Sequence, residues 1–132
     1  MSLVSITRLR LRSWRYFPGQ IWYALLSSRQ AKAAPGNLSV KLMREANNIF
    51  WTCTLWTDEA AMRAFMMSGA HRKAMPRLVE WCDEASVAHY QQETATPPSW
   101  PEAHRRMQTE GRPSKVQHPS EAHKRFDIAA PR

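Results

Sequence analysis

The stretch FWTCTLWTDEAAMRAFMMSGAHRKAMPRLVEW, residues 50–81, contains a change from strand to helix. Its beginning belongs to a run, residues 49–56, that is apolar on both faces and therefore predicts a central strand. The next residues are typical of a helix start, because Thr57 can cap a helix and Asp58 and Glu59 bring negative charge to its first turn. The stretch thus predicts a buried strand followed directly by a helix.

The helical pattern of this stretch is interrupted. Gly69 breaks the pattern, and Pro76 enforces a second break or a kink because proline lacks the amide hydrogen that a helix interior needs. His71 lies at the joint between the two helical pieces. The residues predicted to face the core from the first piece are Ala61, Met62, Phe65 and Met66.

Four further segments flank this stretch. Residues 4–11 are rich in β-branched side chains and predict a strand, and residues 37–45 alternate between apolar and polar side chains, as a strand with one buried face does. Residues 17–34 predict an amphipathic helix with Pro18 in its first turn. Residues 84–92 predict the last strand.

The predicted order of elements is strand, helix, strand, strand, helix, strand. This order predicts an α+β fold of the ferredoxin-like βαββαβ type, with an antiparallel four-stranded sheet and both helices on one face. The other face of such a sheet stays open and needs a cover. A homodimer through this open sheet face, which forms a dimeric α+β barrel, is the expected cover.

The last part of the chain differs from the rest. We assign residues 1–93 to the ferredoxin-like domain and residues 94–132 to a basic C-terminal tail that holds six of the nine prolines. One short helix is predicted there, in SWPEAHRRMQTEG with Ser99 as its cap. The rest of the tail is expected to be extended or mobile.

The net charge of +8 has an uneven distribution along the chain. Residues 1–44 hold eight lysines and arginines and no acidic residue. Arg8, Arg10 and Arg12 alternate, which predicts a solvated strand face, with an anion-binding surface as the second interpretation. Nucleic-acid binding is disfavoured, because no known nucleic-acid-binding motif accompanies the charge.

The cysteines and the start of the chain bear on its location. Cys53 and Cys82 are far apart in sequence, which favours buried free thiols in a reducing compartment over a disulfide or zinc site. The first residues lack the apolar core of a signal peptide, and no apolar run approaches the length of a membrane span. We therefore expect a cytoplasmic protein with no membrane partner.

Residues 50–81 resemble the dimeric α+β barrel superfamily that includes the antibiotic-biosynthesis-monooxygenase-like proteins. The resemblance lies in a strand that ends in LW, the acidic residues after it, and the runs EAAMRAF and SGAHRKAM. The chain is also similar to the spheroidene-monooxygenase-like branch and to uncharacterised bacterial relatives. The resemblance extends over residues 3–92 and implies the fold and the homodimer. Members of this superfamily include oxygenases of polycyclic phenols that use no cofactor, and haem-binding proteins.

His71 is the predicted catalytic residue. A neutral imidazole can take a proton near pH 7, and in cofactor-free oxygenases the deprotonated substrate itself activates oxygen. Two other interpretations of His71 stay open. It can hydrogen-bond a carbonyl at the helix joint without any catalytic role, or it can ligate haem as the resemblance allows. No metal site is expected, because the other histidines are too dispersed for metal-ligand spacing.

Aromatic residues are predicted to hold a flat ligand by stacking. Trp22 is placed on the buried face of the first helix, and Trp51 and Trp56, five residues apart on one strand, point to opposite faces of the sheet. The alternative is that all three are core residues. The full set of predicted ligand-binding residues is Trp14 as a gate, Trp22, Trp51, Trp56 and Arg44, which can pair with an acidic ligand group.

These features favour one function and leave others open. The first is cofactor-independent, monooxygenase-like oxidation of a small hydrophobic or aromatic molecule, with His71 as the base. The second is a non-catalytic dimeric ligand-binding or scaffold protein, because no paired acid–base constellation is present. Haem binding and nucleic-acid binding follow as weaker alternatives.

Overall fold

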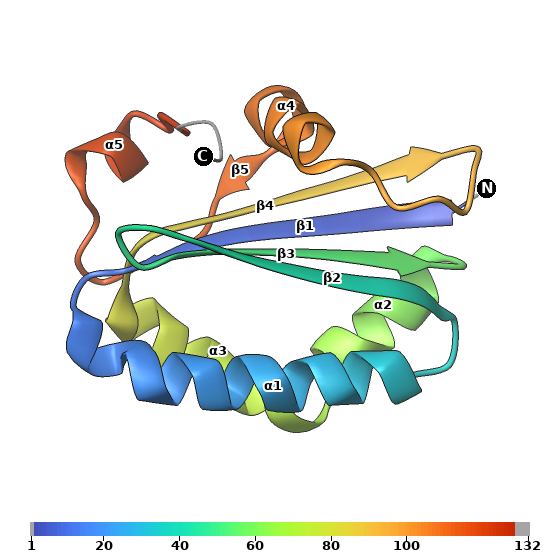
Figure 1. The fold of residues 1–132 in the computed structure, drawn as a ribbon, viewed down its shortest axis with the longest axis horizontal. Helices are drawn as coiled ribbons and strands as arrows, with labels where there is room; N and C mark the ends of the chain where they lie inside the picture. The colour runs from blue at the N-terminus through green and yellow to red at the C-terminus, as the bar shows by residue number, and fades with distance from the viewer. Residues whose placement is uncertain (1, 129–132) are drawn as a thin grey trace.

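The computed structural model describes residues 2–128, except for the side chain at position 70. The predicted order of strands and helices is confirmed (Figure 1). The elements are β1 (Ser2–Leu11), a short 3₁₀ helix η1 (Trp14–Tyr16), α1 (Phe17–Ala33), β2 (Asn37–Glu45), β3 (Ile49–Trp56), α2 (Glu59–Met66), α3 (Gly69–Trp81), β4 (Cys82–Gln92), α4 (Trp100–Glu110), β5 (Arg112–Pro113) and α5 (Glu121–Lys124).

The sheet is antiparallel, with the strand order β2-β3-β1-β4-β5. It has five strands rather than the predicted four. The fifth, β5, is a two-residue strand that pairs Arg112 with Val87 at the outer edge of β4. It exists because the chain returns along this edge after α4, which alternation within residues 112–113 could not reveal.

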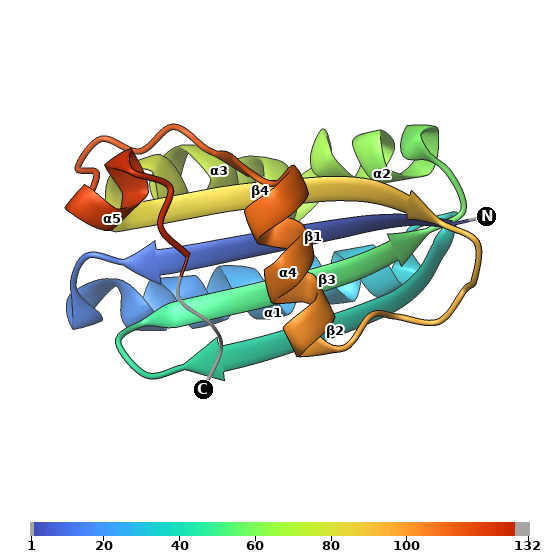
Figure 2. The ribbon, with the colours of Figure 1, turned by 90° about the horizontal axis from the view of Figure 1, so that it is seen from above.

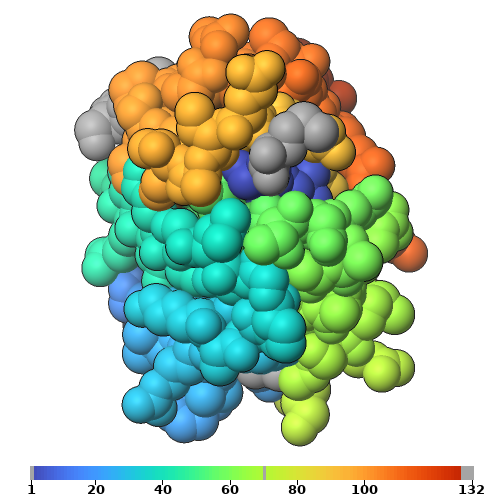
Figure 3. All heavy atoms as spheres, turned by 90° about the vertical axis from the view of Figure 1, so that its right-hand side faces the viewer, coloured from blue at the N-terminus to red at the C-terminus, as the bar shows by residue number. Residues whose placement is uncertain are grey.

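The two faces of the sheet have different covers. Helices α1, α2 and α3 lie on one face, and α4 crosses the other (Figure 2). Seen from the end, α4 and its preceding loop stack on one side of the sheet while α1 and α2 lie on the other (Figure 3). The predicted α+β fold with the domain's helices on one face is confirmed. None of the helices within residues 2–128 is long and apolar enough to cross a bilayer.

The core on the helix side is built around Trp56. Its ring packs on that of Phe65 with centroids 5.2 Å apart, and Met62 and Ala31 complete the cluster. The cap of α2 is not Thr57, as predicted, but the next residue. Asp58 accepts a hydrogen bond from the N–H of Ala61. Thr57 instead extends the strand pairing, because its N–H donates to the Gly36 carbonyl oxygen over 2.8 Å.

The predicted break at Pro76 is wrong. Helix α3 runs through Pro76, and the chain turns earlier, between Met66 and Gly69. Gly69 has a φ of +58°, which a residue with a side chain rarely adopts. The predicted break at Gly69 is therefore the one that the chain makes, through the positive φ of Gly69, and a kink at Pro76 stays a prediction.

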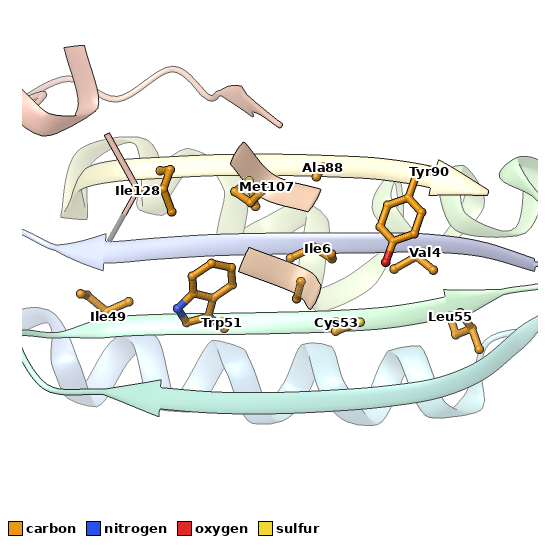
Figure 4. Close-up of a cluster of buried hydrophobic side chains, with 11 residues drawn as sticks. Val4, Ile6, Ile49, Trp51, Cys53, Leu55, Ala88, Tyr90, Met107 and Ile128 are labelled. Carbon is orange, nitrogen blue, oxygen red and sulfur yellow. The ribbon is translucent and has the colours of Figure 1, made fainter. Parts of the chain in front are cut away.

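The second core lies under α4, on the sheet face predicted to be open. Trp51, Ile6 and Tyr90 from the sheet pack with Ala103 and Met107 of α4 (Figure 4). The spacing of Trp100, Ala103 and Met107 places their side chains on one face of α4. The expectation that this face is free for a partner subunit is wrong, because the chain itself covers it. The homodimer stays a prediction, and it needs another surface while α4 is in place.

The C-terminal segment is more structured than a tail with one short helix. Besides α4 it forms β5 and α5, and Ile128 joins the core under α4. Lys41 of the edge strand β2 donates to the Pro98 carbonyl oxygen over 2.8 Å and ties the start of this segment to the sheet. Residues 129–132 of the predicted tail lie outside the described residues.

The expectation of a solvated arginine face is also wrong for Arg8. Its side chain is 3% exposed and lies 2.7 Å from the Glu84 carboxylate, on the α4 side of the sheet. Arg10 bridges Asp83 and Glu84 at 3.2 and 3.1 Å. Arg12 lies beyond the end of β1 and donates to the Glu80 carbonyl oxygen. Alternation correctly puts Arg8 and Arg10 on one face, but α5 and the turn after β2 border that face.

The prediction of two buried free cysteines is confirmed. Cys53 lies under α4, and Cys82 lies at the start of β4 in a cluster with Leu11 and Phe50. Burial raises the pKa of Cys53 to about 11 and that of Cys82 to about 12. Both thiols are therefore protonated at neutral pH and poor nucleophiles.

Candidate functional site

A cavity of ≈160 Å³ lies between the sheet and helices α1, α2 and α3. The sheet residues of its lining mix hydroxyl and apolar side chains, and the helices line it largely with apolar side chains. The residues from the sheet are Ser5, Thr7, Leu9, Val40, Leu42, Thr52, Thr54, Ala85, Val87 and His89. The residues that line it from the helices include Gln20, Tyr23, Ala31, Met62, Phe65, Met66, His71, Met75, Leu78 and Val79.

The hydroxyl groups on the sheet side of the cavity follow from strand alternation. Thr52 and Thr54 of β3 have the same parity as Trp56 and point toward the helices, while Trp51 points toward α4. Thr7 of β1 pairs directly with Thr52. The cavity therefore combines a few hydrogen-bonding groups of the sheet with a largely apolar lining, the usual composition of a small-molecule site.

His71 lines this cavity near the start of α3. Its ring lies against that of Phe65, with centroids 4.9 Å apart, and its Nδ1 lies 3.3 Å from the Met66 carbonyl oxygen. The carbonyl only accepts hydrogen bonds, so Nδ1 carries the proton in the neutral ring. Nε2 is then the unprotonated nitrogen. No residue within 2–128 donates a hydrogen bond to it, so its lone pair is free to accept a proton.

The environment of His71 keeps the ring neutral. Burial lowers the pKa of His71, and the hydrogen bond to Met66 opposes this only in part. Near pH 7 the group is therefore a base rather than a cation. The prediction that His71 bonds a carbonyl at the helix joint and the prediction that it lines a pocket both describe the structure, because one ring nitrogen serves each purpose.

The loop before His71 is held by Gln30 of α1. The Gln30 Nε2 donates to the Ser68 carbonyl oxygen over 2.7 Å and to the Phe65 carbonyl oxygen over 3.3 Å. Its Oε1 accepts from the backbone N–H of His71 over 3.1 Å. A Cβ at Gly69 would lie 2.9 Å from the Gln30 amide, so a side chain at this position would push the amide out of its present place. One amide thus fixes the turn that places His71.

A second histidine, His89 of β4, also lines the cavity. Burial lowers the pKa of His89, and the positive charges of Arg112 and Arg63 lower it further, while Glu59 opposes them. Residue alternation could have found His89, because it has the same parity as Val87 and Ala85. The sequence pattern does not show which side of the sheet holds the cavity.

The predicted aromatic residues do not gather around His71. Trp51 lies on the α4 side of the sheet, where it packs with Trp100. Trp56 lies on the helix side, and its Nε1 donates to Thr54 Oγ1 over 2.8 Å, so it stands behind the cavity wall. The prediction that Trp51 and Trp56 point to opposite faces is confirmed. Their ligand-binding role stays a prediction.

The placement of Trp22 on a buried helix face is wrong. Its side chain is 61% exposed, because α1 turns Gln20 and Ala31 inward instead. Trp14 in η1 is 77% exposed. Arg44 at the end of β2 is exposed, and its guanidinium lies 4.5 Å from the centre of the Phe17 ring. Within residues 2–128, His71 is the one predicted site residue that lines the cavity.

Comparison with known proteins agrees with this architecture. The family model of the antibiotic biosynthesis monooxygenases matches residues 19–77, which include most of α1 and most of α3. The predicted antibiotic-biosynthesis-monooxygenase-like resemblance is thereby confirmed. The match spans less than half of the chain, and it includes Gln30 and His71 but ends before β4. No protein in the curated set matches the chain.

Several solved structures share the fold of this chain. A conserved protein from Methanosarcina mazei is 14% identical, with a TM-score of 0.63, and the match covers 70% of this chain and 94% of that one. SnoaB, a cofactor-independent oxygenase from Streptomyces nogalater, is 15% identical, with a TM-score of 0.57 and coverage of 74% and 98%. A Bacteroides thetaiotaomicron protein is 11% identical, with a TM-score of 0.61 and coverage of 69% and 97%. At these identities the likeness shows the fold alone.

Proposed function

We propose that this chain is a cofactor-independent, monooxygenase-like enzyme that oxidises a small aromatic molecule in the cavity between helices and sheet. The observation that carries the proposal is His71, a neutral imidazole at the cavity whose Nδ1 is bound to Met66 and whose Nε2 is free. The family match and the cofactor-independent oxygenase among the structures of like fold support the same reaction class.

In the proposed reaction, Nε2 of His71 takes a proton from an acidic C–H group beside a phenol or ketone of the substrate. The resulting carbanion gives its electron pair to molecular oxygen and forms a C–O bond, and the peroxide takes up the proton. Loss of water then breaks the O–O bond and leaves a carbonyl. A CH₂ group and O₂ become a C=O group and H₂O, so no external reductant is needed.

The other cavity groups have supporting roles in this proposal. The apolar side chains Met62, Phe65 and Met75 exclude water and contact the rings, which favours a flat and weakly polar substrate. Thr52 and Thr54 can hydrogen-bond oxygen atoms of the substrate, which orients the C–H group. Cavities near this size, about 150 Å³, accept a benzene ring when apolar side chains line them. We therefore propose substrates of one or two rings.

The test is oxygen uptake by the purified full chain with one- and two-ring hydroaromatic ketones and phenols. The His71→Asn variant keeps the polar group at the joint but has no base, and it should lower the rate at least about 100-fold, the usual contribution of a general base. The matched control is His104→Asn, which changes a histidine of α4 on the other side of the sheet. Binding of these compounds without oxygen uptake, in the wild type, would instead support a non-catalytic ligand-binding protein.

A further inference from the structure

The C-terminal segment contributes a wall to the cavity. After α4 the chain crosses to the outer edge of β4, where Arg112 pairs with Val87. The Ser114 N–H then donates to the Ala85 carbonyl oxygen over 2.8 Å. This path brings Ser114 and Lys115 to the helix side, where both line the cavity. The segment that covers one face of the sheet thus also completes the site on the other face.

Further bonds hold this wall in place. The Gln117 N–H donates to the carbonyl oxygen of Val79 in α3 over 2.9 Å, and the Ser120 N–H donates to the Asp83 carbonyl oxygen over 2.9 Å. Lys115 is therefore flanked on both sides by backbone hydrogen bonds to β4 and α3. Its position at the cavity follows from regular pairing and not from a free chain end.

The cavity has an unbalanced charge. Lys115 is the one lysine or arginine among the described residues that line it, and no aspartate or glutamate of the described residues lines it. Within residues 2–128, Lys115 has no ion-pair partner. The two histidines of the cavity are neutral at pH 7, because burial lowers the pKa of each. A neutral ligand leaves the ammonium group unpaired, whereas an anionic oxygen pairs with it.

We infer that the cavity selects an aromatic ligand that carries one anionic oxygen, a carboxylate or phenolate, and that Lys115 is the specificity-determining residue that binds it. The apolar side chains of α3, among them Leu78 and Val79, take the ring. This inference rests on the proposed function and specifies its substrate class. It needs no redox step of its own.

The experiment is a ¹H–¹⁵N NMR titration of the full chain at pH 7.5 with benzoate and 2-naphthoate and with their neutral carboxamides. Each acid and its amide share the ring and the planar shape. The difference in affinity between them therefore measures the effect of the negative charge of the ligand. Lys115→Met removes the charge and keeps the length of the side chain. Lys73→Met, an exposed lysine of α3 outside the cavity lining, is the matched control.

We expect the acids to bind about threefold tighter than the amides in the wild type and in Lys73→Met, as for an ion pair open to solvent. The preference should disappear in Lys115→Met, with shifts centred on His71 and Thr52. Equal affinity for acid and amide in the wild type overturns the inference, as does a preference that survives in Lys115→Met, and both leave the cavity as a ligand site. If none of the four compounds binds, the cavity is not a site for such ligands, and both the inference and the proposed function are overturned.

Discussion

The side-chain amide of Gln30 in α1 accepts a hydrogen bond from the backbone N–H of His71 in α3 and donates two more to carbonyl oxygens of the preceding turn. The two residues are 41 positions apart in sequence. The position of the candidate base therefore depends on a residue of another helix, and this dependence can be measured.

Replacing Gln30 with Ala should destabilise the fold by about 0.5–1.5 kcal/mol, because the partly buried and exposed partners of its amide lose their hydrogen bonds. It should also raise the pKa of His71 toward its ordinary value, since a loosened turn admits water to the ring. Urea unfolding and NMR titration of the His71 ring measure the two effects. Gln108→Ala, an exposed position of α4, should change neither. An unchanged His71 pKa in Gln30→Ala would show that the amide does not position the ring.

The lowered pKa of His71 predicts how stability depends on pH. The unfolded chain, with a histidine pKa near 6.5, binds a proton at a higher pH than the folded chain does. Stability is therefore fully present above pH 6.5 and falls as the pH decreases through 6.5 toward the folded pKa. Urea unfolding at pH 7.5 and 5.5 should show a smaller pH effect in His71→Gln than in the wild type. His118→Gln, an exposed position, should keep the wild-type pH effect.

The buried pair of Arg8 and Glu84 predicts a large loss of stability when one charge is removed. Glu84→Gln leaves the guanidinium of Arg8 buried without its partner charge, and removal of one partner of a buried pair typically costs about 3–5 kcal/mol. Glu59→Gln, which breaks the exposed pair with Arg63, should cost less than about 1 kcal/mol. Thermal unfolding of both variants provides the comparison. Similar losses in the two variants would contradict the buried character of the Arg8 pair.

Helix α4 should be needed to keep the second sheet face covered. Met107→Ala creates a cavity in that core and should cost about 2–5 kcal/mol, while Met67→Ala, at a site 67% exposed, should cost little. Met107→Asp should in addition detach α4 and expose Trp51, Ile6 and Tyr90. Sedimentation should then show a higher association state than that of the wild type at the same concentration. A Met107→Asp chain with the same association state as the wild type would show that α4 is not the cover.

The proposed absence of a cofactor has a direct spectroscopic test. Addition of haem to the purified chain should give no saturable shift of the Soret band, because the cavity at His71 is small for a tetrapyrrole. The His71→Ala variant is titrated in parallel. A saturable shift in the wild type that is lost in His71→Ala would make His71 a haem ligand and replace the proposed mechanism.

Much of the domain could be predicted from local pattern. The alternation of residues 37–45, the apolar run of residues 49–56 and the acidic helix start after it produce the βαββαβ order directly, because periods of 2 and 3.6 decide which local structure buries a face. The opposite orientation of Trp51 and Trp56 follows from the same alternation. So does the position of His71 at a joint, where Gly69 permits a backbone that other residues resist.

The candidate site could be predicted only in part. Trp22 was expected on the buried face of α1, yet apolar side chains occur all around this helix, and packing against the sheet selects the face of Gln20 and Ala31 instead. Arg8 has the sequence context of a surface charge, and only the approach of Glu84 from β4 makes its burial possible. In both cases a partner distant in sequence decides the outcome.

The sequence by itself determined the βαββαβ order of the first part of the chain, which residues of a strand share a face of the sheet, and the place of His71 at the joint between two helices. These features depend on neighbours within a few residues. Only the tertiary structure decided that the C-terminal segment covers the second face of the sheet, and that Lys115 and His71 share one cavity. Those features depend on contacts between distant parts of the chain, which form where buried apolar area and backbone hydrogen bonds outweigh the entropy lost on ordering the segment.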